Sequence, residues 1–598
     1  MNKYRTDIDG LRAVAVIFVV LFHLGYLSNG YLGVDIFFVI SGYLITGLVY
    51  KEVEENKLSV LKFYERRIRR IIPLVLTTTL TSFVLGLIFM LPDDLENLCQ
   101  SIFATNFSAN NILMHITSAD YWAVKNDYKP LMHTWSLGIE EQFYLLYPVI
   151  FFFLKGDKKW LILPLLIFLA TISLLLFFTY NNTSSKFYFL QYRFFELAIG
   201  GICAIIFKRE CKFYTKSSYF LFAFLIAIIY MLSFNVIESY EIKVFVTTIL
   251  TAGILVLGGL HFENNVFYKV LISNKLFIGI GKISFSIYMW HQIVYAFSRY
   301  FLVDKITLKY AIILSIIIVV LSIISYYFIE NPFRNRNRIK TKPLLITIVI
   351  SFLLITGSAL YVYMMGGIIK NVPELGLTTS NRPLQLNFFS SQNNINIEYN
   401  ENVKTNFDKP FSENNKSRIK VLVLGNSYGR DVSNVLLESS FKDSIEVRYS
   451  HLQGLSLESE EDLKIRIKKA DFIFFGSNYP TEQIIQKYNI DMSKVWIIGT
   501  KDFGNSNGIH YNRKIENYST YRTYMKTGVL EKNQKLKKEW GIRYIDLIDL
   551  ISDSEGRVLV FSPDGKFISQ DTLHFTKFGA IFFAQLLDAK FREIMNLV

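Results

Sequence analysis

Residues 9–25 read DGLRAVAVIFVVLFHLG, in which ten consecutive apolar residues lie between Arg12 and His23. Such a run is typical of a membrane-spanning helix, which needs roughly 20 predominantly apolar residues. At about 100° per residue, eleven steps bring both side chains to one face of the helix, about 16 Å apart along its axis. Arg12 could simply anchor the helix end at the membrane surface. An ionisable residue deeper in a span, such as His23, usually faces a cavity and marks a functional path.

The composition indicates that most of the chain is membrane-embedded. It has 598 residues, of which 51% are hydrophobic and 52 are Phe, which argues against a single water-soluble core. We expect about eleven membrane-spanning helices, near residues 11–28, 33–50, 71–91, 142–154, 160–180, 191–207, 217–235, 244–261, 277–301, 307–329 and 343–365. The first is not expected to be a cleaved signal peptide, because its apolar run continues without a small-residue cleavage site.

The distribution of charge predicts the orientation in the membrane. A net charge of +14 could suggest a nucleic-acid partner, but the basic residues gather in alternate loops. They comprise Lys3, Arg5 and the segments 64–70, 155–159, 208–212 and 334–342. This is the positive-inside pattern. We therefore expect no nucleic-acid partner, a cytoplasmic N-terminus and, after an odd number of spans, an extracytoplasmic C-terminal part.

The sequence predicts four regions. Residues 1–340 form a transmembrane domain, 341–370 an additional membrane-spanning helix, 371–417 a linker or irregular extension, and 418–598 a separate α/β domain. In the last region, the short β-rich runs IKVLVLGNS, DFIFFGSN, KVWIIGT and IRYIDLIDL alternate with helical or polar segments, which is typical of a parallel sheet. Three dispersed cysteines, Cys99, Cys203 and Cys211, indicate neither a disulfide framework nor a metal cluster.

Further polar groups recur at the boundaries of the expected spans. Asp35 lies in GVDIFFVISGY, whose Gly33, Ser41 and Gly42 suit close helix packing. Before Pro73 stands a basic cluster formed by Arg66, Arg67, Arg69 and Arg70. This cluster either controls topology or clamps phosphates on the cytoplasmic side.

Two aromatic stretches add candidates. HTWSLGIEEQFYLLYP, at 133–148, carries His133, Trp135, Glu140 and Glu141 at the outer mouth of the fourth expected span. The paired carboxylates could bind a hydroxyl-rich substrate or cap the helix N-terminus. SFSIYMWHQ, at 284–292, places Trp290 and His291 in or near a span, where an interfacial aromatic belt is the alternative to a functional site.

Six motifs, in their order along residues 1 to about 340, resemble the successive signatures of the acyltransferase family 3 membrane domain. They are YRTDIDGLRAVAVIFVVLFHL, GYLGVDIFFVISGYLIT, FYERRIRRIIP, HTWSLGIEEQFYLLYP, SFSIYMWH and IENPFR. The resemblance implies that Arg12 and His23 are essential, that a cytoplasmic acyl-CoA, usually acetyl-CoA, is the donor, and that extracytoplasmic glycans are acylated. Arg12, with the basic cluster, would bind the CoA phosphates, and His23 would act near the acyl transfer. No permanently bound cofactor is expected.

The C-terminal part contains a serine-hydrolase pattern. VLVLGNSYGRD, at 421–431, is an apolar strand that runs into a turn and a helix, which could expose Ser427 as a nucleophile. FFGSNYP places Gly476 and Asn478 after a second strand, where a backbone N–H and a side-chain amide could stabilise an oxyanion. In SQDTLHFTKFGA, His574 would take the serine proton and Asp571 would orient the imidazole.

The order of these blocks resembles the SGNH hydrolase fold, a flavodoxin-like three-layer architecture, over about 418–595. The resemblance implies that Gly454, in SHLQGLS, joins Asn478 in the oxyanion site. Asn426 departs from the aspartate that commonly precedes the serine in this family. A degenerate, non-catalytic module is the alternative. No metal site is expected.

Together, the two resemblances imply a bacterial O-acyltransferase of the cytoplasmic membrane, most simply an O-acetyltransferase. It would move acetyl groups from cytoplasmic acetyl-CoA to hydroxyls of an envelope polysaccharide such as lipopolysaccharide O-antigen or peptidoglycan. Two alternatives remain open at this level: a transporter of a polysaccharide or lipid-linked sugar with an accessory hydrolase-like part, and a membrane-anchored glycan esterase.

Overall fold

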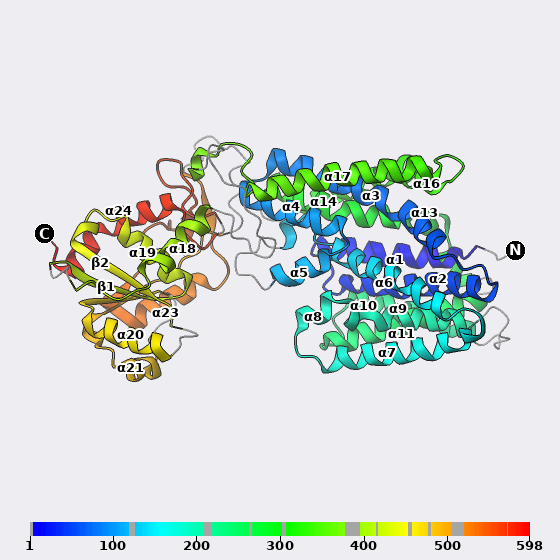
Figure 1. Cartoon of the computed structure of the whole chain (residues 1–598), viewed down its shortest axis with the longest axis horizontal. Coiled ribbons are helices and arrows are strands. Elements are labelled where there is room, and N and C mark those ends of the chain that lie inside the picture. The colour runs from blue at the N-terminus through cyan, green and yellow to red at the C-terminus, as the bar shows by residue number, and fades with distance from the viewer. Residues whose placement is uncertain are drawn as a thin grey trace. The chain divides into compact units, whose positions relative to one another are not determined.

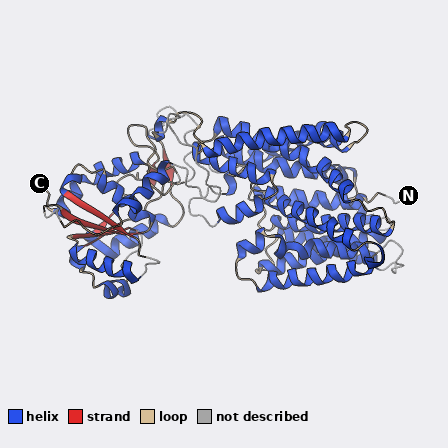
Figure 2. Ribbon diagram, viewed as in Figure 1, coloured by secondary structure: helices blue, strands red, loops and turns tan. Residues whose placement is uncertain are grey.

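The structure is a computed structural model of the whole chain, and it divides into two compact units (Figure 1). Met1–Ile88 and Asn97–Tyr361 form the first, here called the helical unit; Phe89–Glu96 and Val362–Val598 form the second, the α/β unit. The structure describes residues 4–118, 126–207, 217–261, 266–301, 306–376, 395–413, 417–452, 457–476, 480–504, 520–570 and 572–597. Within these ranges, strands occur only in the α/β unit (Figure 2).

Helices make up the first part of the chain. They are α1 (Thr6–His23), α2 (Gly33–Glu54), α3 (Val60–Phe89), α4 (Pro92–Asn106), α5 (Asn110–Ser118), α6 (Thr134–Phe153), α7 (Ile162–Thr179), α8 (Thr183–Tyr188), α9 (Leu190–Ile206), α10 (Ser217–Ser233), α11 (Tyr240–His261), α12 (Val266–Ile272), α13 (Lys275–Lys282), α14 (Ser284–Phe301), α15 (Leu308–Ser325), α16 (Asn331–Arg334) and α17 (Thr341–Met364). A π-helical turn, Tyr326–Glu330, joins α15 to α16.

Six helical segments of the described chain are long and apolar enough to cross a membrane, so the protein is a multi-pass membrane protein. They are Gly30–Glu54, Val60–Phe89, Gly156–Thr179, Tyr240–Gly259, Leu308–Arg334 and Thr341–Met364, and Tyr219–Ser233 is a shorter apolar helix. Other expected spans coincide with α1, α6, α9 and α14, which are shorter or carry buried polar residues.

Some helix bounds differ from the expected spans because polar residues lower the hydropathy of segments that are nevertheless helical. The fourth expected span begins at 142, whereas α6 begins at Thr134, so the polar stretch 134–141 is helical. The expected span 277–301 is two helices, α13 and α14, which are separated at Ile283. Trp290 and His291 are 6% and 0% exposed, so the aromatic-belt interpretation of this stretch is wrong.

Close helix packing in the helical unit depends on small residues, as the sequence predicts for Gly42. A Cβ atom at Gly42 of α2 would lie 1.9 Å from the carbonyl oxygen of Leu197 in α9. On the opposite side of this contact, a Cβ at Gly200 would lie 2.1 Å from the carbonyl oxygen of Val39. The backbones of α2 and α9 therefore touch, which only glycine allows.

The α/β unit is built on a five-stranded parallel sheet in the order β2-β1-β3-β4-β6. Its elements are α18 (Ile395–Phe407), β1 (Ile419–Gly425), α19 (Ser427–Leu437), β2 (Ile445–Ser450), α20 (Leu457–Lys469), β3 (Phe472–Gly476), α21 (Glu482–Tyr488), β4 (Val495–Ile498), α23 (Val529–Trp540), β6 (Tyr544–Ile545) and α24 (Lys577–Met595), with the antiparallel pair β5 (Arg522–Tyr524) and β7 (Arg557–Leu559). The predicted α/β class and its four β-rich runs are confirmed as β1, β3, β4 and β6. The helix α18 lies within residues 371–417, for which the sequence predicts a linker.

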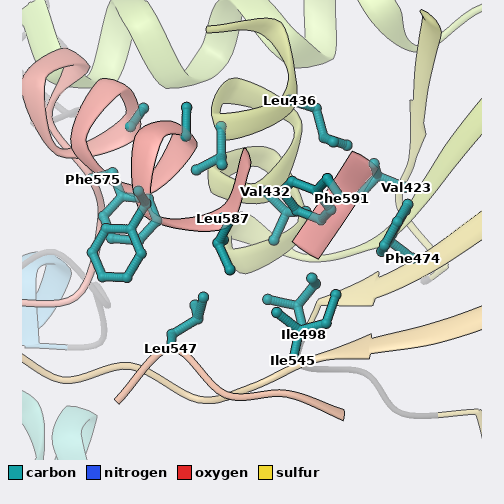
Figure 3. Close-up of a cluster of buried hydrophobic side chains, with 14 of the residues drawn as sticks. Val423, Val432, Leu436, Phe474, Ile498, Ile545, Leu547, Phe575, Leu587 and Phe591 are labelled. Carbon is teal, nitrogen blue, oxygen red and sulfur yellow. The ribbon is translucent and has the colours of Figure 1, made fainter. Parts of the chain in front are cut away.

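Successive side chains of a strand point to opposite faces of the sheet, so they pack into two hydrophobic cores, one on each face. Val421 and Val423 of β1 pack with Phe591 of α24 and with α19 (Figure 3). Leu422 and Leu424 pack on the other face, with α20 and α23. In Figure 1, α19 and α24 lie on one side of the sheet, and α20 and α21 on the other. The sheet and the helices on its two faces form three layers. In the strand order β2-β1-β3-β4-β6, the topological switch point lies between β1 and β3.

The helix contact generates a test. Gly42→Ala should lower the thermal denaturation midpoint of the solubilised protein or its abundance in membranes, because overpacking against backbone costs about 1–3 kcal/mol or more. Gly357→Ala in α17, where a Cβ meets nothing within 4 Å, is the matched control. Equal stability of the two variants would show that α2 and α9 do not touch as described.

Candidate active sites

Arg12 lies in the second turn of α1, where it lines a narrow cavity of about 80 Å³ among α2, α3, α6 and α14. The same guanidinium lines a second, wider cavity of about 430 Å³, and the two cavities share Arg12, Leu44, Arg70 and Phe285. They lie towards the end of the helical unit at which α1 begins. His23 is the last residue of α1 and does not line either cavity.

Cations that make no ion pair line the two cavities, together with three carboxyl groups: Glu140 lines the narrow cavity, and Asp9 and Glu330 line the wider one. Among the described residues, none makes a hydrogen bond or ion pair with Arg12, Arg67, Arg70, Lys282 or Arg334. Arg5 also lines the wider cavity, but it is paired with Asp7. The unpaired cations provide a site for a ligand with several negative charges.

The structure divides the predicted basic cluster by role. Arg69 is 2% exposed; it donates to the side chains of Glu65 and Thr341 and to the carbonyls of Phe333 and Ile339. Its contacts join α3 to the segment before α17, which is a structural role.

Arg66 pairs with Glu52 at 2.9 Å. Only Arg67 and Arg70 reach the cavity, where the Arg67 guanidinium lies 5.8 Å from the ring centre of Tyr144.

The carboxylates of α6 lie inside the helix and do not cap it. Glu140 lines the narrow cavity and accepts hydrogen bonds from Ser41 and Tyr144, both at 2.9 Å. Glu141 accepts a hydrogen bond from Ser108. Because α6 begins at Thr134, both acids stand beyond the first turn, so the helix-capping interpretation is wrong.

Asp35 and Trp135 belong to the packing of the helical unit. Asp35 bonds Arg193 at 2.8 Å, and Arg193 also contacts Glu196 at 3.0 Å; all three side chains are at most 1% exposed. Trp135 packs on Phe187, with ring centres 4.4 Å apart. The ion triad fixes α2 against α9, and neither Asp35 nor Trp135 lines a cavity with a free charge.

Three histidines come together beyond the narrow cavity. The ring of His291 lies 5.1 Å from the ring of His23 and 5.1 Å from that of His133. Tyr288, which lines the cavity, lies 5.4 Å from His291. Within the described residues, no three His, Cys, Asp or Glu side chains are placed to hold a metal ion.

In the α/β unit, Ser427 begins α19 directly after β1. The side chain of Asn426 accepts a hydrogen bond from the Tyr428 N–H and caps the helix. This cap explains why an asparagine suits the position before Ser427. Gly425 has φ +155° and is paired with Gly476, and a Cβ on Gly425 would lie 2.2 Å from the Gly476 carbonyl oxygen. Ser427 therefore stands at the carboxyl end of β1, at the switch point where parallel α/β sheets bind ligands.

The residues expected to complete this site are partly described. Gly476 ends β3 beside Gly425. Asp571, Gly454 and Asn478 lie outside the described residues, as does Cys211. His574 is 3% exposed, and its ring lies 6.4 Å from the ring of Tyr428, the neighbour of Ser427. The structure therefore brings His574 close to the start of α19.

A buried lysine joins the segment of His574 to α19. Lys501 Nζ bonds the carboxylate of Asp431 and the carbonyl of Leu573. The side chains of Lys501 and Asp431 are 2% and 0% exposed.

Thr572 has φ +77°, an unfavourable conformation for a β-branched residue, and its carbonyl accepts from Phe503 N–H at 2.8 Å. These contacts hold a strained turn next to His574.

The end of β1 is fixed by a phenol. Tyr449 of β2 donates to the Gly425 carbonyl at 2.9 Å. Burial raises the pKa of Tyr449, so the hydroxyl remains protonated and continues to donate throughout the physiological range. The turn that carries Ser427 is thus anchored on the side opposite Gly476.

Sequence analysis missed Lys501, Asp431, Arg193, Glu196 and Tyr288. Arg193 and Glu196 had a usable signal, because two charges three residues apart in an expected span imply a buried partner. Lys501 follows β4 without any motif, and its partner Asp431 is 70 residues away.

The buried pair generates a stability test. Lys501→Met should lower the free energy of unfolding of the α/β unit by about 3–5 kcal/mol, because it leaves the Asp431 carboxylate buried without a counter-ion. This free energy is measured by unfolding the solubilised full chain in urea and using limited proteolysis to detect when the α/β unit unfolds. Lys487→Met, which breaks a half-exposed pair with Glu460, should cost less than about 1 kcal/mol. Equal effects in both variants would contradict the assignment, whereas partial recovery in Lys501→Met/Asp431→Asn would support it.

Comparison with known proteins agrees with the architecture of the helical unit. Residues 5–327, just over half of the chain, match the family described as Acyltransferase domain, acyltransferase family 3. The O-acetyltransferase OatA of Staphylococcus aureus strains NCTC 8325 / PS 47, COL and MRSA252 is 33% identical over 355 residues, which are 56% of this chain and 58% of the relative. The chain thus matches 58% of the length of these curated relatives. No solved structure is significantly similar to it. Since the family match covers more than half of its residues, the chain belongs to acyltransferase family 3.

Proposed function

We propose that the protein is an O-acetyltransferase that moves acetyl groups from cytoplasmic acetyl-CoA to hydroxyls of an envelope polysaccharide. The observation that carries the proposal is the set of five unpaired cations around the two adjoining cavities. CoA carries several phosphate charges at one end and the acyl thioester at the other. Arginine, with its planar fork of donors, suits phosphate groups better than any other side chain.

The linings of the two cavities support separate sites for the two ends of this donor. The wider cavity, with Arg12, Arg70, Lys282 and Arg334, would bind the phosphates. The narrow cavity continues among α2, α6 and α14, past Glu140 to Ser136 and Tyr288, and would receive the thioester arm. Arg12 lines both cavities, so it would contact the donor where its charged and uncharged parts meet. His23 would act on the reacting groups beyond Tyr288.

The positive-inside pattern supports an orientation in which the cavities open to the cytoplasm. The basic segments 64–70 and 334–342 lie at the same end of the helical unit as the start of α1. With about eleven spans in the bacterial cytoplasmic membrane, the α/β unit would be extracytoplasmic, in reach of envelope glycans.

In the α/β unit, we infer an SGNH-type site that passes the acetyl group on to the glycan. The sheet order and the position of Ser427 after β1 support this assignment. Ser427 would take the acetyl group from the acceptor that is acylated in the helical unit; His574 would take the serine proton and return it to the leaving oxygen, and Asp571 would orient the imidazole. The oxyanion would be stabilised by the N–H of Gly454 and the amide of Asn478. The sugar hydroxyl then attacks the acetyl ester, and His574 accepts its proton while Ser427 regains one.

Envelope polysaccharide acetylation tests the proposal. Deletion of the gene should remove O-acetyl signals from the NMR spectrum of the purified glycan, and the wild-type gene should restore them. Ser427→Ala should restore less than about 1% of the wild-type level, as expected when a nucleophile is removed. Ser433→Ala, a buried serine later in α19, should restore most of it. Unchanged or increased acetylation in the deletion strain would contradict the transferase and favour an esterase.

A further inference from the structure

The histidine cluster is formed by His23, His133 and His291, three of the eight histidines of the chain. They come from three different parts of the helical unit: the end of α1, the residue before α6 and the middle of α14. His133 and His291 are 2% and 0% exposed. The proposed function assigns a role to His23 alone, so two buried imidazoles beside it have no role yet.

The hydrogen bonding of His291 determines which of its nitrogens carries the hydrogen. Nδ1 lies 2.6 Å from the carbonyl oxygen of Tyr288, three residues earlier in α14. A carbonyl oxygen only accepts, so Nδ1 is the protonated nitrogen. In the neutral ring, Nε2 is then a free lone pair, and it has no hydrogen-bond partner among the described residues. His291 is therefore a base that its backbone partner holds in one tautomer.

His23 lies within reach of this base. Their ring centres are 5.1 Å apart, a spacing at which ring nitrogens can exchange a proton through a hydrogen bond, directly or across one water molecule. Arg299 of α14 donates to the His23 carbonyl at 2.9 Å, which fixes the end of α1 beside α14. The other titratable groups in ring contact with His291 are His133, Tyr288 and Tyr295, and the nearby fixed charge is that of Arg299, which acts on His23 and Tyr295.

Two hydroxyl groups connect the cluster to the arginine-lined cavity. Tyr288 donates to the carbonyl of His133 at 2.8 Å, and because this uses its one hydrogen, its oxygen accepts from Ser136 Oγ at 2.6 Å. Both Tyr288 and Ser136 line the narrow cavity together with Arg12. Polar groups thus lead from His23, past His291 and Tyr288, towards the site proposed for the thioester, and a water molecule at Nε2 of His291 would complete the connection.

We propose that His291 is the proton acceptor of His23 and that this set of groups returns the hydroxyl proton to the departing CoA. This inference rests on the proposed acetyl transfer. In that reaction an acceptor oxygen forms a bond to the acetyl carbonyl carbon, the carbon–sulfur bond breaks, and CoA leaves as a thiolate. The hydroxyl proton passes to His23, from His23 to Nε2 of His291, and then across a water molecule and the hydroxyls of Tyr288 and Ser136 to the thiolate. Atoms and charge balance without another reactant.

The experiment compares His291→Gln and His291→Ala in the full chain, in inverted membrane vesicles of a deletion strain whose own envelope glycan is present. Release of the CoA thiol from added acetyl-CoA gives kcat and KM. Both variants should lose kcat by about 10²- to 10⁴-fold, the usual contribution of a proton-transfer group, with KM for acetyl-CoA within threefold of wild type. His115→Gln is the control, since His115 lies in α5 against Ser184 and Phe189, away from the cluster.

The Gln variant separates proton transfer from a structural role. A glutamine amide can still donate to the Tyr288 carbonyl, but it cannot accept a proton. If His291 only supports α14, His291→Gln should regain the rate that His291→Ala loses, and that result, or a change in KM alone, would overturn the proposal. Wild-type vesicles that release no more CoA than vesicles of the deletion strain would instead refute the proposed function, and this inference would fall with it.

Discussion

A guanidinium within a bilayer is costly unless it is paired with an acid or faces water, and this chain uses both solutions. Arg193 is enclosed between Asp35 and Glu196 and serves the packing of α2 on α9. Arg12 has no acidic partner among the described residues and faces two adjoining cavities instead. Because Arg12 makes no ion pair with the Asp9, Glu140 and Glu330 carboxyls that line these cavities, its guanidinium is free to bind an anion that enters from outside.

The same contrast explains why residues of one cluster differ in role. Arg69 is tied to a carboxylate, a hydroxyl and two carbonyls, and it joins distant parts of the helical unit. Arg70, one residue later, has no such contacts and lines both cavities. In the α/β unit, Lys501 resembles Arg69: its charge is fully used within the protein, where it holds the turn beside His574. The charges that are paired within the protein stabilise its fold, and the unpaired charges remain free to bind a ligand.

Much of the fold follows from local patterns in the sequence. The apolar strands β1, β3, β4 and β6 are recognisable because each is a short β-rich run that is followed by a turn. β2 was not expected, since its sequence IEVRYS alternates charged and apolar residues and resembles an exposed segment. The helical stretch 134–141 is not predictable from hydropathy because Glu140 and Glu141 lower it, although Ser41 of α2 and Ser108, between α4 and α5, donate hydrogen bonds to them. Such partners are distant in sequence, so no local pattern reveals them.

The candidate sites show the same limit. The shared helix face of Arg12 and His23 is predictable from their spacing, but the cavity that Arg12 enters, and the meeting of His23 with His291, depend on how α1 packs on α14. The sequence motif also treats the four arginines at 66–70 alike, and only the fold distinguishes the two that face the cavity.

Calorimetric titration of the solubilised full chain with CoA and with 3′-dephospho-CoA tests most directly whether the unpaired cations bind the donor. CoA should bind more tightly than the dephosphorylated form, and Arg70→Gln should weaken CoA binding about tenfold or more, as expected for a lost hydrogen bond between charged groups. Arg338→Gln, an exposed arginine of the same basic end, should change affinity less than threefold. Equal binding of CoA to wild type and Arg70→Gln, with no effect of the 3′-phosphate, would contradict the account.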